Sequence, residues 1–203
     1  MSTKEKILHT AGAIFAEKGY RGATVSRICR QAGVNIAAVN YHFGSKARLY
    51  EQVWEYASRR TDEIHGIDDP RLSPEHRLRN EIRKMITMIF DKGPGGWLPR
   101  LIRRISEVGE ERAEELRTRF LLPRRRKMEE MVGEYLGEDP GSFRVRCLTG
   151  HIFSMCIFLN IKLRIRRDLF KKEEPTPDEI ESLIGSIQEF ALGGLERLKN
   201  PSI

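Results

Sequence analysis

The residues whose types and spacing could do chemistry lie mostly between positions 24 and 46, and the chemistry that they suit is contact with nucleic acid. A turn at Gly33 separates two short segments that have helical spacing. On the second segment, residues 36–43, a step of about 100° per residue divides the side chains between two faces. The inward face is expected to hold Ile36, Val39 and Phe43. The outward face is expected to hold Ala37, Ala38, Tyr41 and His42, with Asn40 at its border.

The expected outward face suits insertion into the major groove of DNA. Small residues permit close approach, and hydroxyl, imidazole and amide groups can reach bases or phosphates. Lys46 follows one turn later and can reach a phosphate. The alternative is an ordinary helical hairpin with a solvated face. Such a face normally displays charge, whereas residues 36–43 contain no Asp, Glu, Lys or Arg, so the pattern favours DNA binding.

The net charge of the chain is concentrated around these residues. The chain carries +7 in total, and its first 60 residues carry +6 of that charge. A compact basic segment joined to a near-neutral body is the electrostatic pattern expected of nucleic-acid binding. A basic solvated surface would give the same charge, so the charge supports the helical pattern without replacing it.

The elements that must position these residues are helices. Capping and breaking residues predict them over 7–19, 25–32, 36–43, 46–61, 78–89, 97–106, 110–136, 143–167 and 177–199. Pro123 should kink or split the helix over 110–136, and Lys92–Gly96 should form a mobile loop. We find no convincing strand, so the predicted fold class is all-α.

Length and composition exclude several classes of protein. The 203 residues, 39% hydrophobic and 32% charged, are typical of a globular chain of one or two domains. Three scattered cysteines give no disulfide framework and suit a reducing compartment. The longest segment without charged residues, 147–161, is too short to cross a bilayer, and the N-terminus has no signal-peptide pattern. The sequence therefore predicts a cytoplasmic protein with no membrane partner.

The C-terminal body is expected to form a homodimer. The helix over 147–165 is apolar nearly all round, which predicts burial on all sides. The last helix adds a stripe of Ile180, Ile184, Ile187, Ala191, Leu195 and Leu198. Two such helices from each of two subunits would form a four-helix interface under twofold symmetry. A monomer whose other helices cover this pair is the alternative.

Some residues of the C-terminal body are candidates for lining a ligand pocket, although such residue types more often form a core. The candidates are Met85, Met88, Trp97, Arg103, Phe120, His151, Met155 and Phe158. If buried, His151 needs a hydrogen-bond partner, and Arg103 could meet an anion at the pocket mouth. The expected effector is a largely apolar small molecule.

Metal binding and catalysis find little support in the sequence. Cys147, His151 and Met155 share a helix face that could serve a soft metal, but no further pair completes a shell. We therefore predict no metal site and no cofactor. The sequence also lacks a phosphate-binding glycine loop, a Gly-x-Ser-x-Gly motif and a nucleophile–base pair, so an enzyme is not predicted.

The segment from Thr24 to Tyr50, and Tyr41-His-Phe-Gly-Ser-Lys46 above all, closely resembles the DNA-binding signature of the tetracycline-repressor (TetR) family. The resemblance covers about residues 3–56. It implies an all-α homodimeric bacterial regulator with two domains. Residues 1–56 would form a three-helix helix-turn-helix DNA-binding domain, and residues 57–203 a helical ligand-binding and dimerisation domain.

The resemblance also implies which residues contact DNA. In that family the residues matching Thr24, Tyr41 and Lys46 touch phosphates, and the helix around 37–42 reads bases. The full predicted set is Thr24, Arg27, Asn35, Ala37, Ala38, Asn40, Tyr41, His42 and Lys46. Residues 35–40 depart from the Ser/Lys/Gly-rich opening common in the family, so no operator sequence is implied.

The implied function is that of a ligand-responsive regulator, expected to be a repressor. It would bind a palindromic operator in double-stranded DNA as a homodimer through its last two helices, and a small-molecule effector would release it. The alternative is a constitutive or architectural DNA-binding protein without ligand gating.

Overall fold

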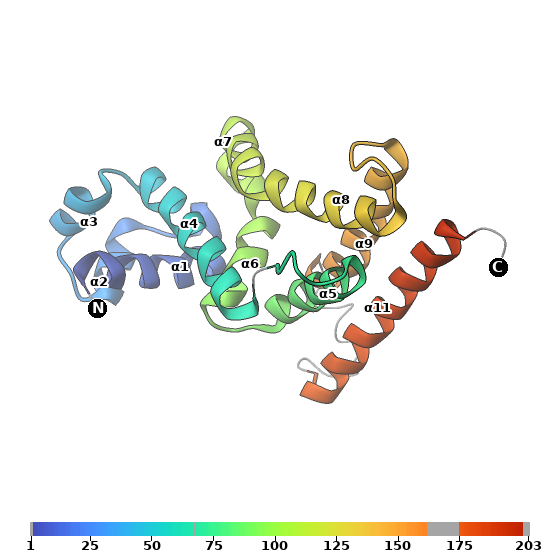
Figure 1. The fold of residues 1–203 in the computed structure, drawn as a ribbon. Helices are drawn as coiled ribbons and strands as arrows, with labels where there is room; N and C mark the ends of the chain where they lie inside the picture. Colours follow the sequence, from blue (N-terminus) through green and yellow to red (C-terminus); the bar gives the residue numbers. More distant parts are fainter. Residues whose placement is uncertain (1, 67, 162–174, 201–203) are drawn as a thin grey trace. The chain divides into compact units, whose positions relative to one another are not determined.

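A computed structural model describes residues 2–66, 68–161 and 175–200, except the side chains of residues 158–161. Every regular element in these ranges is helical, which confirms the predicted fold class (Figure 1). In chain order they are α1 (Thr3–Gly22), α2 (Val25–Ala32), α3 (Ile36–Phe43), α4 (Lys46–His65), α5 (Pro74–Phe90), the 3-10 turn η1 (Pro94–Gly96), α6 (Trp97–Arg103), the 3-10 turn η2 (Ile105–Val108), α7 (Glu110–Leu116), the π turn η3 (Arg117–Leu121), α8 (Leu122–Leu136), α9 (Phe143–Ile161) and α11 (Pro177–Lys199). None of the described helices is both long and apolar enough to cross a bilayer. The predicted continuation of α9 to about residue 167 lies outside the described residues.

The chain forms two compact units. The first unit contains residues 1–66 and 90–121, and the second contains residues 67–89 and 122–203. Elements from the middle of the chain therefore belong to the same unit as the N-terminal helices. The functional division into residues 1–56 and 57–203 is a separate matter and stays a prediction.

α1 is defined by a capping box at its start and by a glycine near its end. The Ser2 hydroxyl accepts the Glu5 N–H at 3.2 Å, and the Glu5 carboxylate accepts the Ser2 N–H at 2.7 Å. The sequence predicts that Gly19 ends this helix, but the structure interrupts α1 there and continues it to Gly22. Gly19 has a φ of 73°, and a Cβ would lie 2.8 Å from Cδ of Glu107. The positive φ favours glycine here, whereas the Glu107 carboxylate is the end of a flexible side chain that could move aside.

The N-terminal helices and α4 enclose the core of the first unit. Its fully buried side chains include Ile7, Phe15, Ile28, Val39, Leu49, Tyr50 and Trp54. Residues 90–121 contribute Trp97, Leu98, Leu101, Leu116 and Phe120 to the same core. This shared apolar core explains why the later segment belongs to the first unit.

Trp97 is the main contact between α6 and the N-terminal helices. It is only 3% exposed. Its ring lies edge-on to His9 of α1, with centroids 5.2 Å apart, and 5.9 Å from the ring of Tyr56 in α4. Gly12 provides the space, because a Cβ at that position would lie 3.0 Å from Cη2 of Trp97 and closer still to Cζ3 and Cε3.

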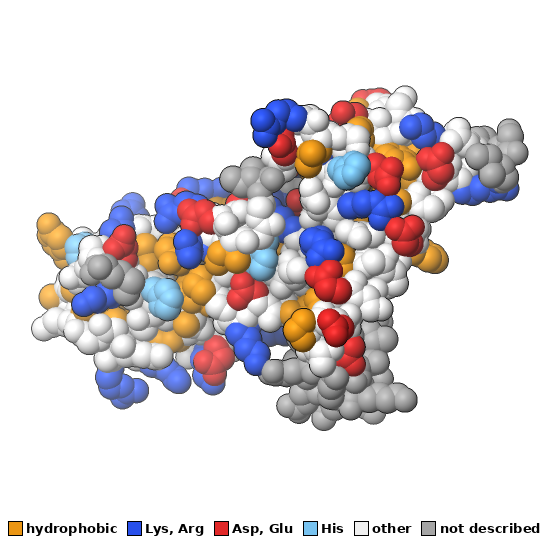
Figure 2. Space-filling view, turned by 60° about the horizontal axis from the view of Figure 1, so that its bottom comes forward, with side chains coloured by type: hydrophobic (Ala, Val, Ile, Leu, Met, Phe, Trp, Pro, Cys, Tyr) orange, Lys and Arg blue, Asp and Glu red, His pale blue; other side chains and the backbone are white. Residues whose placement is uncertain are grey.

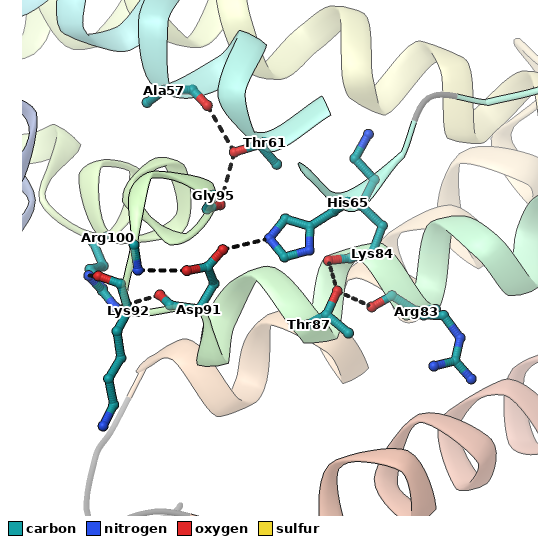
Figure 3. A network of polar contacts seen from close by, with 11 residues as sticks. Ala57, Thr61, His65, Arg83, Lys84, Thr87, Asp91, Lys92, Gly95 and Arg100 are labelled. Atoms are coloured by element: carbon teal, nitrogen blue, oxygen red, sulfur yellow. Dashed lines mark hydrogen bonds and ion pairs between the residues drawn. The ribbon is translucent and has the colours of Figure 1, made fainter. Parts of the chain in front are cut away.

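Polar contacts fix the loop before α6 (Figure 3). The Thr61 hydroxyl of α4 lies 2.9 Å from the Ala57 carbonyl and 3.0 Å from the Gly95 carbonyl. Nε2 of His65 lies 3.1 Å from a carboxylate oxygen of Asp91, and Arg100 donates to the Asp91 carbonyl at 2.6 Å. The expectation of a mobile loop over 92–96 is therefore wrong: Gly95 is buried and its carbonyl is bonded to α4.

The helix predicted over 110–136 is split, as expected from Pro123. The π turn η3 separates α7 from α8 just before this proline. Proline has no N–H, and its ring clashes with the carbonyl four residues earlier, so a wider turn relieves the crowding.

A nearly buried ion-pair cluster joins three segments of the second unit. Arg77 of α5 donates to both carboxylate oxygens of Asp68, at 3.0 and 2.9 Å, and also bonds Glu134 of α8. The Asp68 side chain is 5% exposed, and Lys127 lies 3.7 Å away. The Arg77 guanidinium holds the pKa of Asp68 below its usual value. The cluster links the start of the unit to α5 and α8.

The burial of α9, expected on all sides with a partner subunit as part of the cover, is supplied only in part by its own chain. Within the chain, one face is buried, formed by Val145, Thr149, Ile152 and Cys156. Phe143 is 76% exposed and His151 is also exposed. On α11, Ile184, Ala191 and Leu195 of the predicted stripe are buried, whereas Leu198 is 42% exposed. An apolar helix predicts burial but does not say whether the same chain supplies the cover.

Candidate DNA interface

Two helices and a tight turn form the predicted helix-turn-helix. Gly33 follows α2 with φ 66° and ψ 38°, the left-handed conformation that glycine adopts without strain. Its N–H bonds back to the Arg30 carbonyl, and the Val34 N–H bonds the Cys29 carbonyl at 3.0 Å. These bonds satisfy carbonyls at the end of α2, and α3 begins three residues later. The local sequence therefore fixes the turn.

Helix α3 presents an uncharged, exposed stripe. Val39 and Phe43 face the core, at 0% and 3% exposed, as predicted. Tyr41 is 85% exposed and belongs to the outward face. Figure 2 shows apolar side chains on the surface at the α2–α3 end of the first unit, with Lys and Arg side chains around them.

The exposed stripe is rotated from its predicted position. Ile36, predicted to face inward, is 48% exposed, and Asn40 is exposed rather than at a border. Ala38 and His42, predicted to face outward, are half-buried. A helical wheel gives the direction of a side chain around the axis but not how far along the axis the covering helices reach. Ile36 is the first residue of α3, so the direction of its side chain around the helix axis is not enough to bury it.

The helix caps place exposed polar groups beside helix N-termini. The Thr24 hydroxyl accepts the Arg27 N–H at 3.2 Å, and Oδ1 of Asn35 accepts the Ala37 N–H at 3.0 Å. The partial positive charge of a helix N-terminus attracts phosphate. Since Asn35 caps α3 through its oxygen, its NH₂ group remains available to donate to the DNA backbone. Both caps suit phosphate contact, the predicted role of Thr24.

Lys46 is held in place by an aromatic ring. Its ammonium lies 4.3 Å from the centroid of the Tyr20 ring, and its partial burial lowers its pKa. Tyr20 is itself packed against Phe15 and Tyr50. A cation over an aromatic face is attracted to it and loses part of its freedom. Lys46 is thus a positioned charge beside the recognition helix, while Arg27 lies exposed on α2.

The candidate pocket residues are divided between the two units. Met85, Met88, His151 and Met155 belong to the second unit, and Trp97, Arg103 and Phe120 belong to the first. Trp97 and Phe120 lie in the core of the first unit, with Phe120 5.7 Å from the ring of Trp54. Phe158 lies outside the described side chains. The ligand roles of these residues stay predictions.

Arg103 is the charged candidate with the clearest surroundings. It is exposed at the end of α6, and burial together with neighbouring Arg104 and Arg100 lowers its pKa. Within the described ranges no acidic side chain pairs with it. His151 is exposed on α9, so the condition under which its imidazole would need a buried partner does not arise within the chain.

The fold and the exposed recognition helix define a helix-turn-helix transcriptional regulator. Residues 7–53 match the model of the bacterial regulatory proteins of the tetR family. Residues 74–195, more than half of the chain, match the C-terminal domain of the HTH-type transcriptional dual regulator CecR. The chain belongs to the TetR family, which comprises DNA-binding regulators of transcription rather than enzymes.

Individual relatives agree with this assignment. The negative transcriptional regulator IcaR of the biofilm operon icaADBC of Staphylococcus aureus is 43% identical over 49 residues, which are 24% of this chain and 26% of IcaR. The match thus spans about a quarter of that relative. A crystal structure of a transcriptional regulator from Rhodococcus sp. Rha1 has a TM-score of 0.70 at 16% identity, over 95% of this chain and 97% of that one. FadR of Bacillus subtilis in complex with stearoyl-CoA has a TM-score of 0.68 at 19% identity, over 94% and 98%. At these identities the two structures show the shared fold.

Proposed function

We propose that this chain is a ligand-responsive repressor that binds a palindromic operator as a homodimer and leaves it when a small-molecule effector binds. The observation that carries the proposal is the exposed, uncharged stripe of α3, which includes Tyr41. A tyrosine that is 85% exposed contributes little to the core and is available to contact DNA. The basic N-terminal third of the chain supplies the attraction to phosphates.

Repression is the proposed direction of regulation, on the basis of the relatives and of the way in which a bound dimer would obstruct the polymerase. IcaR is a negative regulator, and CecR is a dual regulator. A dimer that occupies a promoter blocks the polymerase, which is repression in its simplest form. Because such a protein acts on the chromosome, we place it in the cytoplasm.

The proposed dimer interface consists of α9 and α11. Both helices carry apolar side chains that the described chain leaves uncovered, with Phe143 and Phe190 each 76% exposed. Among the described residues, no atom beyond the adjacent backbone of α11 lies within 4 Å of a Cβ built on Gly193 or Gly194, so a partner helix can approach α11 closely. Twofold symmetry would place two copies of α3 about 34–36 Å apart, or a multiple of that distance, to match half-sites of an operator.

The proposed effector is largely apolar and carries a polar or anionic group. Bacillus subtilis FadR, which shares the fold, holds stearoyl-CoA, a long apolar chain on a phosphate-bearing carrier. In this chain Met85 is buried on α5, and Met88 and Met155 are half-buried on α5 and α9. Methionine adapts to apolar ligands of different shapes.

Selection of operator DNA from a random library tests the DNA-binding part. The full chain should enrich a palindromic sequence, and Tyr41→Ala should weaken binding to it at least tenfold by fluorescence anisotropy. Tyr41→Phe, which keeps the ring and removes the hydroxyl, separates a hydrogen bond to phosphate from ring contact. The melting temperature of both variants should match that of the unchanged protein, because Tyr41 is exposed. Failure to enrich any sequence would refute operator recognition.

A panel of acyl-CoA thioesters, fatty acids and apolar drugs tests the effector. A ligand should raise the melting temperature and weaken operator binding; a tenfold change in affinity needs about 1.4 kcal/mol of differential binding. Met155→Trp should alter this response while leaving ligand-free DNA binding intact. If no compound changes either quantity, the constitutive alternative replaces the ligand-gated one.

A further inference from the structure

We propose that Ile36 recognises the 5-methyl group of a thymine in each operator half-site and is a specificity-determining residue of this protein. The inference rests on the proposed function, because it requires α3 to enter the major groove. It starts from the exposure of Ile36, which the amphipathic pattern of α3 does not predict.

Ile36 is an exposed apolar side chain at the start of the helix that faces outward. It is 48% exposed and is the first residue of α3, directly after the cap on Asn35. The N-terminal residues of a recognition helix are those that contact base edges. Ile36 and Asn40 are one turn apart and both exposed, so Ile36 continues the outward stripe rather than lying beside it.

The chemistry of the major groove leaves one target for an aliphatic side chain. Isoleucine has no donor or acceptor, so it cannot read the hydrogen-bonding pattern of a base. Among the four bases, thymine alone presents a methyl group in this groove, and apolar side chains recognise it by contact. Burial of that methyl group against Ile36 would remove apolar surface of both partners from water.

The local geometry favours close contact. Ala37, the next residue, is exposed and small, and residues 36–43 hold no charged side chain that would keep water at the surface. Isoleucine is branched at Cβ and therefore stiff at χ1, so little rotamer freedom is lost when it is immobilised against a base. An uncharged first turn with one stiff aliphatic side chain suits methyl recognition better than phosphate contact.

The test removes the methyl group without changing base pairing. Each thymine of the selected operator is replaced in turn by deoxyuridine, and binding of the full chain is measured by fluorescence anisotropy. Replacement at one symmetric position should weaken binding about fourfold in one half-site and about fifteenfold in both, the effect of losing one buried methyl group per half-site. Replacement at the other thymines should leave affinity within twofold.

Two matched variants assign the effect to Ile36. Ile36→Ala should weaken binding to the thymine operator and make binding indifferent to deoxyuridine at the sensitive position. Ile64→Ala is the control, because Ile64 is 45% exposed on α4 and lies outside the helix-turn-helix. It should bind both operators as the unchanged protein does.

Each other outcome has a distinct meaning. Specific operator binding that is insensitive to every deoxyuridine substitution would overturn the inference and leave the proposed function intact. Equal sensitivity to deoxyuridine in Ile36→Ala and in the unchanged protein would also overturn it, since another residue would then read the methyl group. Absence of any sequence-specific binding would refute the proposed function and the inference together.

Discussion

Replacement of Gly12 by alanine should destabilise the protein, even though alanine is the better helix former. Gly12 lies inside α1, where the same change at an open position stabilises by about 0.5–1 kcal/mol. Here the added Cβ would lie 3.0 Å from Cη2 of Trp97 and closer to two further ring carbons. Nonbonded carbons are at their best separation at about 3.5–4.0 Å, so either the ring or the helix must move.

The expected size follows from how little the ring can move. Trp97 is 3% exposed and is confined by His9 and Tyr56. Overpacking of a tight core costs about 1–3 kcal/mol, and the overlap here favours the upper part of that range. After the gain in helix propensity, the free energy of unfolding should fall by about 1–2 kcal/mol.

Urea unfolding followed by circular dichroism measures this change, and the Trp97→Ala background supplies the control. Without the indole ring, Gly12→Ala should become neutral or stabilising, because only the helix propensity remains. The two effects of Gly12→Ala should therefore differ in sign between the backgrounds. A stabilising Gly12→Ala in the otherwise unchanged protein, or the same loss in both backgrounds, would refute the packing argument.

Three further changes test the interface, the dimer and the ion-pair cluster. Lys46→Ala should reduce the slope of log K against log salt by about one, and an unchanged slope would remove Lys46 from the phosphate contacts. Phe190→Glu should convert dimers into monomers in light scattering, because Phe190 is 76% exposed on α11, and persistence of dimers would move the interface elsewhere. Asp68→Asn should lower the free energy of unfolding at neutral pH by about 2–3 kcal/mol. Because the pKa of Asp68 is lowered in the folded state, this difference should be full above the ordinary Asp pKa of about 4, decline below it and be lost as the pH falls through the lowered pKa of the folded state. A difference independent of pH would contradict the role of the charge.

Sequence reasoning succeeds where the deciding interaction is local. Thr24, Asn35, Ser45 and Thr176 each cap a helix by accepting a hydrogen bond from an N–H group two or three residues later. Such bonds depend on the residue type and on a few neighbours, and both are visible in the sequence. The ends and the turn of the helix-turn-helix are therefore predictable from local sequence.

Sequence reasoning says less where a distant segment decides the outcome. The place of Trp97 in the core depends on Gly12, a partner far away in the sequence, while its ligand role stays a prediction. Hydropathy predicts that α9 is buried but does not identify the surface that covers it. Exposure of Ile36 likewise depends on where the neighbouring helices end. In each case the sequence does not show the tertiary contact that decides whether the side chain is buried.

The discontinuous first unit restricts how this protein could exchange parts with its relatives. Residues 90–121 complete a core with the N-terminal helices, with Phe120 beside Trp54 and Trp97 beside Tyr56. A single genetic crossover after residue 66 would separate these partners and leave a DNA-reading fragment with an open apolar side. An exchange that keeps both cores whole would have to retain 90–121 with the N-terminal helices and replace 67–89 and 122–203 together. Gradual substitution inside one unit thus disturbs fewer core contacts than wholesale replacement of the C-terminal half.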